Sequence, residues 1–299
     1  MFKKYPPQRF ALSFLSRTAT LWPDKLYLEL VYYLRMGKKL NLDNPETFTQ
    51  KLNWLKLYDR NPYYTKLVDK YEIKKIVAEK IGEKYVVPLY GVWDNFDDID
   101  FEKLPNAFVL KTTHDSGGLV VVKDKKSFDR EAAKKKIENS LKANYWKYGR
   151  EWPYKNVPHR IIAEQYIPSL GKEDSIEYKL TCINGECRMV SICQGIPHVS
   201  WDTRWNDHFD KDWNRMDFVM EYRNTGKDYK KTPVIEEMMR LSEVLAADLP
   251  TARVDFYVVD DKIYFGEITF FTHAGFMPFE PEKYDYIMGS WLKLPNKRK

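Results

Sequence analysis

The sequence is poor in cysteine and contains no long apolar run. Its 299 residues include three cysteines, Cys182, Cys187 and Cys193. No apolar stretch approaches the roughly 18 residues that a membrane-spanning helix needs, and residues 1–20 lack the apolar core and cleavage site of a secretory signal. An odd number of cysteines without an export signal predicts reduced thiols and a cytoplasmic protein. A disulfide between Cys182 and Cys187, which the Asn184-Gly185 turn would bring together, is therefore not expected.

Several common site motifs are missing as well. The sequence has no Gly-Lys-Ser or Gly-Lys-Thr and no G-x-G-x-x-G after a predicted strand, which excludes two common phosphate loops. Neither His114 nor His273 has a cysteine or carboxylate at zinc spacing, so we expect each to be a polar loop residue first and a substrate contact second. Two Asp-x-Asp strings, Asp98-Ile-Asp100 and Asp210-Lys-Asp212, could hold the metal of a sugar nucleotide, although short acidic strings are frequent in loops.

The composition is that of an ordinary soluble globular protein. Hydrophobic residues make up 43% and charged residues 31%, which excludes collagen-like and broadly disordered chains. The net charge of +6 permits an anionic ligand or surface but does not require nucleic acid, and we expect no nucleic-acid partner. Aromatic residues, at 15%, suit a deep core and are compatible with sugar stacking.

The apolar periodicity predicts both helices and hairpins. The first 60 residues and the segments 66–81, 127–141 and 235–247 have helical spacing, and Asn44-Pro45-Glu46 is typical of a helix start. Strand patterns cover 107–111, 119–122, 160–167, 177–183, 186–192, 252–259 and 263–269. Segment 91–105 is expected to be a linker, and 201–231 an irregular loop. The helix at 66–81 should turn four lysines outward: Lys66, Lys70, Lys74 and Lys80. These elements predict an α+β or mixed α/β fold with largely antiparallel sheets.

Two segments carry candidate binding residues on strands. In the hairpin 108–122, Gly117 and Gly118 let backbone N–H groups approach an anion, and Lys111 adds a point charge, so a phosphate clamp is one interpretation. A mobile tip with a solvated lysine is the other. In the strand 160–167, Glu164 lies between large apolar neighbours and needs a partner, either a ligand amino group or a basic side chain of the protein.

Further along, Glu177 and Lys179 share a strand face, which a solvated face with a cross-strand ion pair would also explain. The last hairpin carries Arg253 and Asp255 on one arm and Glu267 on the other. A turn with an odd number of residues would set Asp255 opposite Glu267, whereas a two-residue turn would separate them onto opposite faces. Facing carboxylates are typical magnesium ligands beside phosphates, and Arg253 could stabilise developing negative charge. The alternative is a hairpin whose acids are solvated.

In this order, these segments resemble the ATP-grasp superfamily, and more narrowly its TupA-like branch, which is associated with teichuronopeptide and bacterial surface polysaccharide synthesis. The stretches that carry the branch resemblance are Leu42-Asp-Asn-Pro-Glu-Thr-Phe, Lys51-Leu-Asn-Trp-Leu-Lys-Leu-Tyr-Asp-Arg-Asn-Pro62, Leu67-Val-Asp-Lys-Tyr71, Tyr148-Gly-Arg-Glu-Trp-Pro-Tyr-Lys155 and Ile263-Tyr-Phe-Gly-Glu267. The resemblance implies an ATP-grasp fold in which two sheet-containing subdomains clasp ATP, with Mg²⁺ as cofactor. It implies a helical N-terminal segment at 1–60 and subdomains at 61–160 and 161–299.

The resemblance also assigns roles to individual residues. Phosphate contacts are implied for Lys70, Lys111, Ser116, Gly117, Gly118 and Lys179. Adenine contacts are implied for the hinge residues Glu164, Gln165, Tyr166 and Ile167, and a ribose contact for Glu177. Arg253 would act in catalysis together with Lys111, and the metal ligands would be Asp255, Glu267 and Thr269, the last standing where the family pattern has asparagine.

The implied function is an ATP- and Mg²⁺-dependent carboxylate–amine ligase that acts through an acyl phosphate in surface polysaccharide or capsule synthesis. Its partners would be a small amine and a carboxylate or glycan precursor. A glycosyltransferase using an Asp-x-Asp metal, an ATP-grasp kinase of a sugar acceptor and a non-catalytic glycan-binding module are the alternatives. The basic and aromatic N-terminal segment could also contact the inner face of the membrane.

Overall fold

The computed structural model describes residues 6–168, 176–194 and 204–297. Its helices are α1 (Pro6–Arg17), α2 (Asp24–Met36), α3 (Phe48–Tyr58), α4 (Tyr63–Val68), α5 (Glu72–Lys80), α6 (Arg130–Leu141), α7 (Trp146–Gly149), α8 (Pro233–Ala246) and α9 (Lys283–Trp291). Its strands are β1 (Leu89–Trp93), β2 (Phe108–Thr112), β3 (Leu119–Val122), β4 (Ile161–Gln165), β5 (Ile176–Ile183), β6 (Glu186–Gln194), β7 (Trp205–Asp210), β8 (Thr251–Val259) and β9 (Lys262–Thr269). The short 3-10 helices η5 (Trp152–Asn156) and η7 (Thr272–Gly275) lie near the site.

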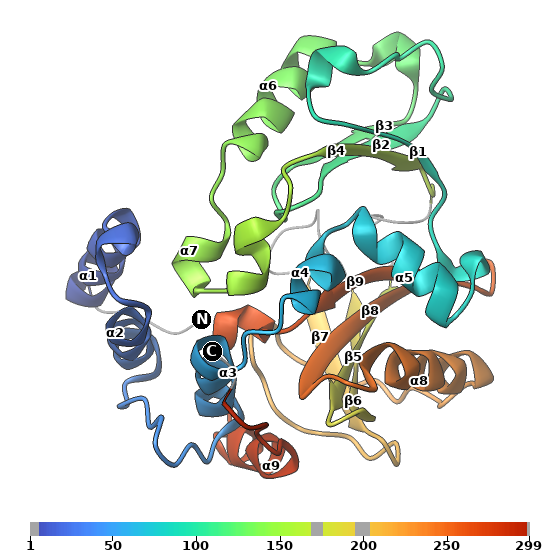
Figure 1. Ribbon diagram of the computed structural model, residues 1–299. Coiled ribbons are helices and arrows are strands. Elements are labelled where there is room, and N and C mark those ends of the chain that lie inside the picture. Colours follow the sequence, from blue (N-terminus) through green and yellow to red (C-terminus); the bar gives the residue numbers. More distant parts are fainter. Residues whose placement is uncertain (1–5, 169–175, 195–203, 298–299) are drawn as a thin grey trace.

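The strands form two antiparallel sheets. One has the order β1-β4-β2-β3 and the other β7-β6-β5-β8-β9. Helix α6 covers one face of the first sheet and α8 one face of the second, while α4 and α5 lie between the two sheets (Figure 1). The expected mixed α/β fold with antiparallel sheets is therefore confirmed.

Each sheet has its own hydrophobic core. The smaller core lies between the first sheet and α6 and includes Phe96, Phe108 and Ile137. The larger core joins the second sheet to α8 and to the helices α1 to α5. The structure therefore has two lobes, each with its own core.

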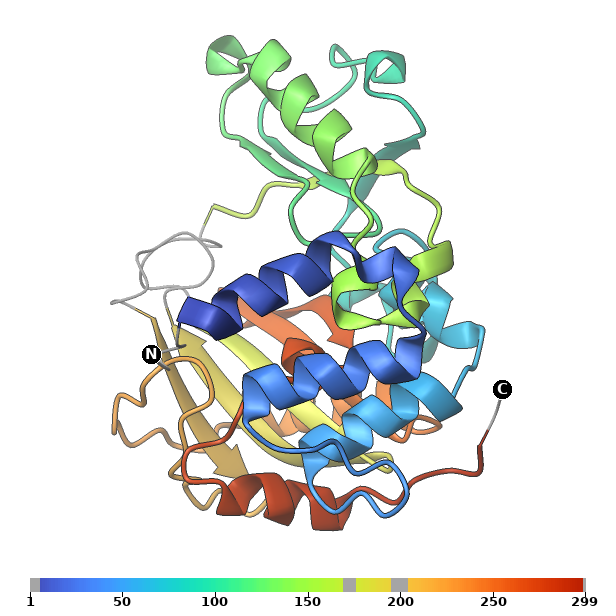
Figure 2. The same ribbon diagram turned by 90° about the vertical axis from the view of Figure 1, so that its left-hand side faces the viewer.

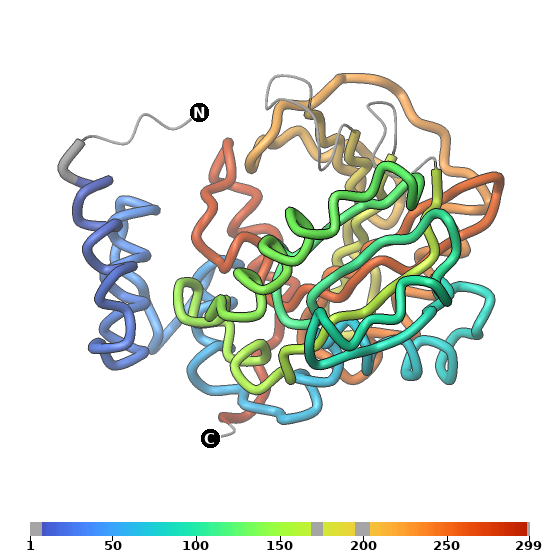
Figure 3. The backbone as a smooth tube through the Cα atoms, turned by 90° about the horizontal axis from the view of Figure 1, so that it is seen from above, coloured from blue at the N-terminus to red at the C-terminus, as the bar shows by residue number. Residues whose placement is uncertain are grey.

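The N-terminal helices α1 and α2 pack as a pair at one side of the molecule (Figures 2 and 3). Helix α3 continues from this pair and is fixed to α9, because the buried Asp285 carboxylate accepts hydrogen bonds from the Thr49 backbone N–H at 2.8 Å and its hydroxyl at 2.6 Å. A Cβ built at Gly289 on α9 would lie 2.1 Å from the Glu46 carbonyl oxygen. Only glycine therefore allows this close helix contact.

Four sequence predictions of local structure were wrong. Thr47, not Asn44, caps α3, in a reciprocal capping box with Gln50. The helix expected at 66–81 is broken, because the Asp69 carboxylate accepts the N–H of Tyr71 at 2.8 Å and so starts the new helix α5. The expected linker 91–105 supplies the end of β1, and the expected irregular loop 201–231 contains β7. Both are edge strands of their sheets, and the outer side of β7 forms isolated bridges with Arg215 and Arg223.

The division at residues 60 and 160 differs from the sheet pairing at one point. Strand β4 begins at Ile161 and pairs with β1 and β2, so it belongs to the first sheet. We therefore place the proposed start of the second subdomain after Gln165. Between residues 176 and 194, Cys182 lies opposite Cys187 across the Asn184-Gly185 turn, and both thiols are free and buried.

Candidate functional site

The register of β8 and β9 decides whether their acids can act together. The turn has two residues, Asp260 and Asp261, both with positive φ, and Val259 pairs with Lys262. Such a turn alone would separate Asp255 and Glu267 onto opposite faces. A β-bulge at Gly266 adds one residue to β9, so that Asp255 pairs with Glu267. The turn is thus two residues long, and the bulge restores the facing arrangement.

Asp255 is the centre of a buried group of charges on the second sheet. Its carboxylate is fully buried and accepts two hydrogen bonds of 2.7 Å from Arg253, in a bidentate pair. Lys179, directly across on β5, donates to it at 3.2 Å and also pairs with Glu177 at 2.8 Å. Burial opposes ionisation of Asp255, but Arg253 and Lys179 outweigh it and lower the pKa of this carboxyl. The ion pair that the sequence allowed for Lys179 is therefore present, but the face is buried and not solvated.

The predicted metal ligands lie together beside this pair. Arg253 Nη2 is 3.3 Å from Glu267 Oε1 and 3.1 Å from Thr269 Oγ1. The Glu267 side chain is 45% exposed, so its carboxylate can be reached from the cleft. Two carboxylates and a hydroxyl are hard oxygen donors, the kind that Mg²⁺ prefers, and in this structure Arg253 donates to both oxygens of Asp255. Their assignment as ligands remains a prediction.

On the first sheet, Glu164 is held by two lysines. Lys111 Nζ lies 2.6 Å from one carboxylate oxygen, and Lys74 Nζ lies 2.7 Å from the other. Burial would raise the pKa of Glu164, but the two ammonium groups outweigh it and hold this pKa at about 2. The partner that the sequence required for this embedded acid is thus a pair of lysines from α5 and β2.

Lys70 and Lys74 point inward, so the prediction that both face outward was wrong. The break at Asp69 takes Lys70 out of the helix, and its ammonium donates to the backbone carbonyl of Asp115. Burial lowers the pKa of Lys70, opposed by the field of Glu267 on the other lobe. Lys70 therefore couples the two lobes electrostatically.

The glycine tip has a structural part and an open part. The buried Asp115 carboxylate accepts from the Gly118 N–H at 3.1 Å and from the hydroxyls of Thr112 and Ser140. A Cβ on Gly118 would lie 2.0 Å from Thr112 Oγ1, so this glycine is needed for packing. Ser116 and Gly117 are exposed, so they are the tip residues that a phosphate can reach.

The hinge residues follow β4 toward the second sheet. The Gln165 N–H donates to the Pro88 carbonyl at 2.9 Å, Tyr166 is half-buried, and Ile167 is buried. Glu177 is buried beside Lys179, and its pKa is raised by burial. Contacts of these residues with adenine and ribose remain predictions.

A cavity of about 290 Å³ is lined by residues of both lobes. Asp115 and Ser116 line it from the first lobe, Lys70 from the segment between α4 and α5, and Arg253, Glu267 and Thr269 from the second sheet. Side chains that are more than a hundred residues apart in the chain thus share one pocket, as an ATP-binding cleft requires. Lys111 does not line this cavity but pairs with Glu164, and its charge lowers the pKa of Lys70.

The two histidines differ in position. His114 is buried, stacks on His159 with a ring separation of 3.6 Å, and does not line the cavity. His273 does line it, and burial lowers its pKa to about 3. The acidic strings lie elsewhere, in the turns after Asn95 and after β7, where Asp98 accepts from Asn95 and Asp210 from Asn214.

Sequence reasoning missed four residues of the site: Lys74, Tyr145, Glu151 and Tyr154. Lys74 lies one residue after the buried Ile73 and three before Val77, so it borders the apolar face of α5. That spacing could have identified it. Glu151 stands inside the stretch 148–155 that carries the family resemblance, but no pattern of residue types indicated its direction.

Comparison with known proteins decides the family. The model of the family described as TupA-like ATPgrasp matches residues 50–293. The chain belongs to this family. The expected resemblance is thereby confirmed over most of this chain. The search of curated proteins found no match.

Comparison with solved structures gives matches at low sequence identity. An L-amino acid ligase from Bacillus licheniformis is 14% identical, with a TM-score of 0.47, over 97% of this chain and 63% of that one. A RimK domain ATP-grasp protein from Sphaerobacter thermophilus is 12% identical, with a TM-score of 0.43, over 79% and 70%. The D-alanine–D-alanine ligase of Bacillus anthracis, complexed with ATP, is 18% identical, with a TM-score of 0.39, over 68% and 54%. This chain thus spans about half the length of the last protein.

The Glu164 network predicts an acid-sensitive contribution to stability. Because folding lowers the pKa of Glu164 from 4.5 to about 2, its pairing stabilises the fold fully above pH 4.5 and is lost as the pH falls toward 2. We expect Glu164→Gln to lower the free energy of unfolding by about 3 kcal/mol at pH 7. This difference from wild type should shrink steadily below pH 4.5, as measured by urea unfolding.

Glu79→Gln is the matched control, because Glu79 lies on α5 with its side chain 63% exposed. It should leave the unfolding free energy unchanged at each pH. A difference between wild type and Glu164→Gln that stays constant down to pH 3 would contradict the assigned pairing.

Proposed function

We propose that this TupA-like protein is an ATP- and Mg²⁺-dependent ligase that joins a carboxylate to an amine through an acyl phosphate. The observation that carries the proposal is the shared cavity, where Lys70 and Ser116 face Arg253, Glu267 and Thr269. The cavity presents the cations Lys70 and Arg253 together with the exposed carboxylate of Glu267, which suits a triphosphate with its counter-cation. Membership of the ATP-grasp family supports the same nucleotide.

The residues of the chain act mainly by binding and positioning. Lys70 and Lys111 attract the phosphates, and Ser116 and Gly117 close over them. Asp255, Glu267 and Thr269 would hold Mg²⁺, which neutralises phosphate charge when bound. Arg253, fixed by Asp255 in its bidentate pair, faces the charge that develops on the transferred phosphoryl group.

The reaction proceeds in two displacements. A carboxylate oxygen of the first substrate attacks the γ-phosphorus of ATP, and the bond to the β–γ bridging oxygen breaks to release ADP. The amine then attacks the acyl carbon, the bond between this carbon and the phosphate oxygen breaks, and phosphate leaves. The products are an amide, ADP and phosphate, and positioning supplies most of the catalysis.

The substrates that we propose come from surface polysaccharide synthesis. The family branch supports an amino acid or peptide joined to a uronic acid of a glycan precursor, with either partner supplying the amine. The abundant aromatic residues are compatible with a sugar acceptor. Among the described residues, the Asp-x-Asp strings do not line the cavity, so the glycosyltransferase alternative has no metal site there.

The activity is tested by ADP release with Mg-ATP, glucuronate or galacturonate, and the standard amino acids. We expect Lys111→Ala and Asp255→Asn to lower kcat/KM by about a hundredfold or more, since each removes a charge at the phosphates. Asp212→Asn, in one of the acidic strings, is the matched control and should retain wild-type turnover.

Each rival function gives its own result in this experiment. Equal turnover of the wild type and all variants would contradict the proposal. No ADP release, with thermal stabilisation by uridine nucleotides that is lost in Asp212→Asn, would favour the glycosyltransferase. ADP release that depends on a sugar but on no amine would favour the kinase, and no thermal response to any nucleotide would favour the glycan-binding module.

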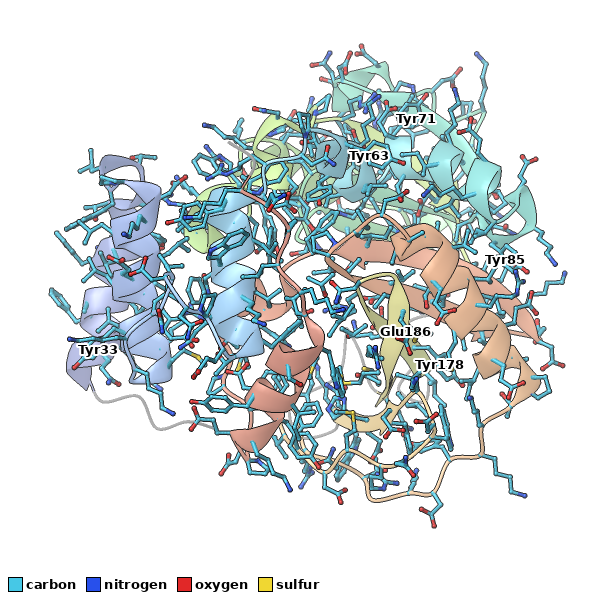
Figure 4. The ribbon with its side chains drawn as sticks, turned by 60° about the horizontal axis from the view of Figure 1, so that its bottom comes forward. Tyr33, Tyr63, Tyr71, Tyr85, Tyr178 and Glu186 are labelled. Carbon is cyan, nitrogen blue, oxygen red and sulfur yellow. The ribbon has the colours of Figure 1, made fainter. Side chains whose placement is uncertain are left out.

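We also propose that the protein works in the cytoplasm at the inner face of the membrane. On α1, Phe10 and Phe14 are exposed at helical spacing, 78% and 54%, and Leu21 follows at 79%. Arg9 and Arg17 flank them, so the outer face of the helical pair combines apolar and basic side chains, which suits an anionic membrane surface. Figure 4 shows the exposed Tyr33 beside the helical pair at the edge of the molecule. Among the described helices, none has the length and apolar character to span a bilayer.

Vesicle sedimentation tests this contact. We expect the wild-type protein to bind phosphatidylglycerol vesicles more tightly than phosphatidylcholine vesicles. The double variant Phe10→Ser with Phe14→Ser should weaken this binding at least about tenfold, because it removes two aromatic side chains that would insert into the membrane surface. Tyr286→Ser, an exposed aromatic residue on α9, is the control. Equal sedimentation of the wild type and the double variant would contradict the contact.

A further inference from the structure

The turn after α7 is fixed to the N-terminal helices. Its Arg150 adopts a left-handed backbone conformation, with φ of 54°, and its guanidinium is buried. This guanidinium donates to the carbonyl of Trp22 at 3.1 Å, pairs with Asp24 at 3.0 Å, and lies 4.1 Å from the centre of the Tyr27 ring. The contacts of the Arg150 side chain are therefore all structural, and they fix the position of the next residue in the chain.

The next residue, Glu151, turns toward the cavity. A Cβ built at Gly149 would lie 2.8 Å from Glu151 Oε1 and 2.8 Å from the Cβ of Ala274, so only glycine leaves room for this carboxylate against η7. On the other side, Trp152 stacks on Tyr64 with a ring separation of 5.7 Å. The packing of the stretch 148–155, which carries the family resemblance, thus orients the Glu151 side chain toward the cavity.

The Glu151 carboxylate is buried, at 9% exposure, and lines the cavity with Arg253 and Glu267. Among the described residues, none gives it a hydrogen bond or an ion pair. Its main opposing charge is Lys56, whose ammonium is itself buried and donates to the Ala274 carbonyl at 2.6 Å and to Asn53 at 3.2 Å. Lys56 supplies a field from behind but no contact, and an acid in this state needs a ligand.

The groups that face Glu151 come from four elements. They are Lys56 on α3, Arg253 on β8, Glu267 on β9, and Tyr145 and Tyr154 of the α7–η5 segment. Arg253 is taken by Asp255 in its bidentate pair. The Glu151 carboxylate is therefore available to a donor on a molecule in the cavity.

We propose that Glu151 binds the ammonium group of the amine substrate and takes up its proton before the amine attacks. This inference rests on the ligase function proposed above and locates its acceptor subsite. Leu67, Val68 and Phe271 line the same cavity, so the expected ligand is a primary amine on a small, partly apolar organic group, such as an amino acid.

Protons and electron pairs balance in this step. The ammonium gives one proton to Glu151, which becomes a neutral carboxylic acid, and the free amine forms a C–N bond with the acyl carbon. The C–O bond to phosphate breaks with its electron pair on the phosphate, which receives the second proton of the amine. Burial raises the pKa of Glu151 to about 7, against the opposing fields of Lys56 and Arg253, which suits proton uptake near neutral pH.

The test measures amine binding by thermal shift, with and without Mg²⁺ and a non-hydrolysable ATP analogue. The probes are glycine, L-alanine, L-lysine and ethanolamine, and glycolate and L-lactate serve as hydroxyl counterparts of the first two. We expect at least one amine, but not its hydroxyl counterpart, to stabilise the wild type. Glu151→Gln should weaken that amine at least about tenfold while the nucleotide response stays unchanged, since a charge-assisted bond is lost.

Two further variants make the result decisive. Lys56→Met combined with Glu151→Gln removes both buried charges and guards against misfolding of the single variant. Glu138→Gln, an exposed acid on α6, is the control and should bind as the wild type does. Amine binding that is equally tight without Glu151, or no stabilisation of the wild type by any probe amine, would overturn the inference. A missing nucleotide response with intact amine binding would count against the ligase function instead.

Discussion

The constraint on which this structure depends is the cost of burying charge. Two carboxylates, Glu164 and Asp255, are almost wholly removed from water, one on each sheet. Each is stable there because two cationic side chains hold it, Lys111 and Lys74 in one case and Arg253 and Lys179 in the other. Of these four cations, Arg253 also lines the cavity, beside the exposed Glu267 carboxylate. Arg253 therefore contributes to the stability of the fold and to the charge that the cavity presents.

The N-terminal helices have a place in this arrangement that composition alone does not indicate. They share the larger core with the second sheet, so they are an integral part of that lobe. Through Arg150 they fix the turn that carries Glu151, and through Lys56 they supply the opposing charge behind it. If Glu151 binds the amine as proposed, the helical segment completes the amine side of a cleft whose phosphate side is built by the two sheets.

The sequence predicted the fold class and most strands because alternation of apolar and polar residues reports directly on sheet faces. It also predicted correctly that Asp255 and Glu267 lie on the two strands β8 and β9, and that the glycine tip joins β2 to β3. It could not predict the bulge at Gly266, because a single glycine is compatible with either register. It placed Lys70 and Lys74 outward because a continuous helix was assumed, and the hydrogen bonds of Asp69 break that helix. The inward turn of Glu151 depends on tertiary contacts of Gly149 and Arg150, which leave no local pattern.

The most direct measurement of the shared cleft is a crystal structure with Mg²⁺ and a non-hydrolysable ATP analogue. We predict that the γ-phosphate lies in the cavity between Lys70 and Arg253, with the metal bound by Asp255 and Glu267. A nucleotide bound outside this cavity, with no phosphate within contact of Lys70 or Lys111, would contradict this prediction.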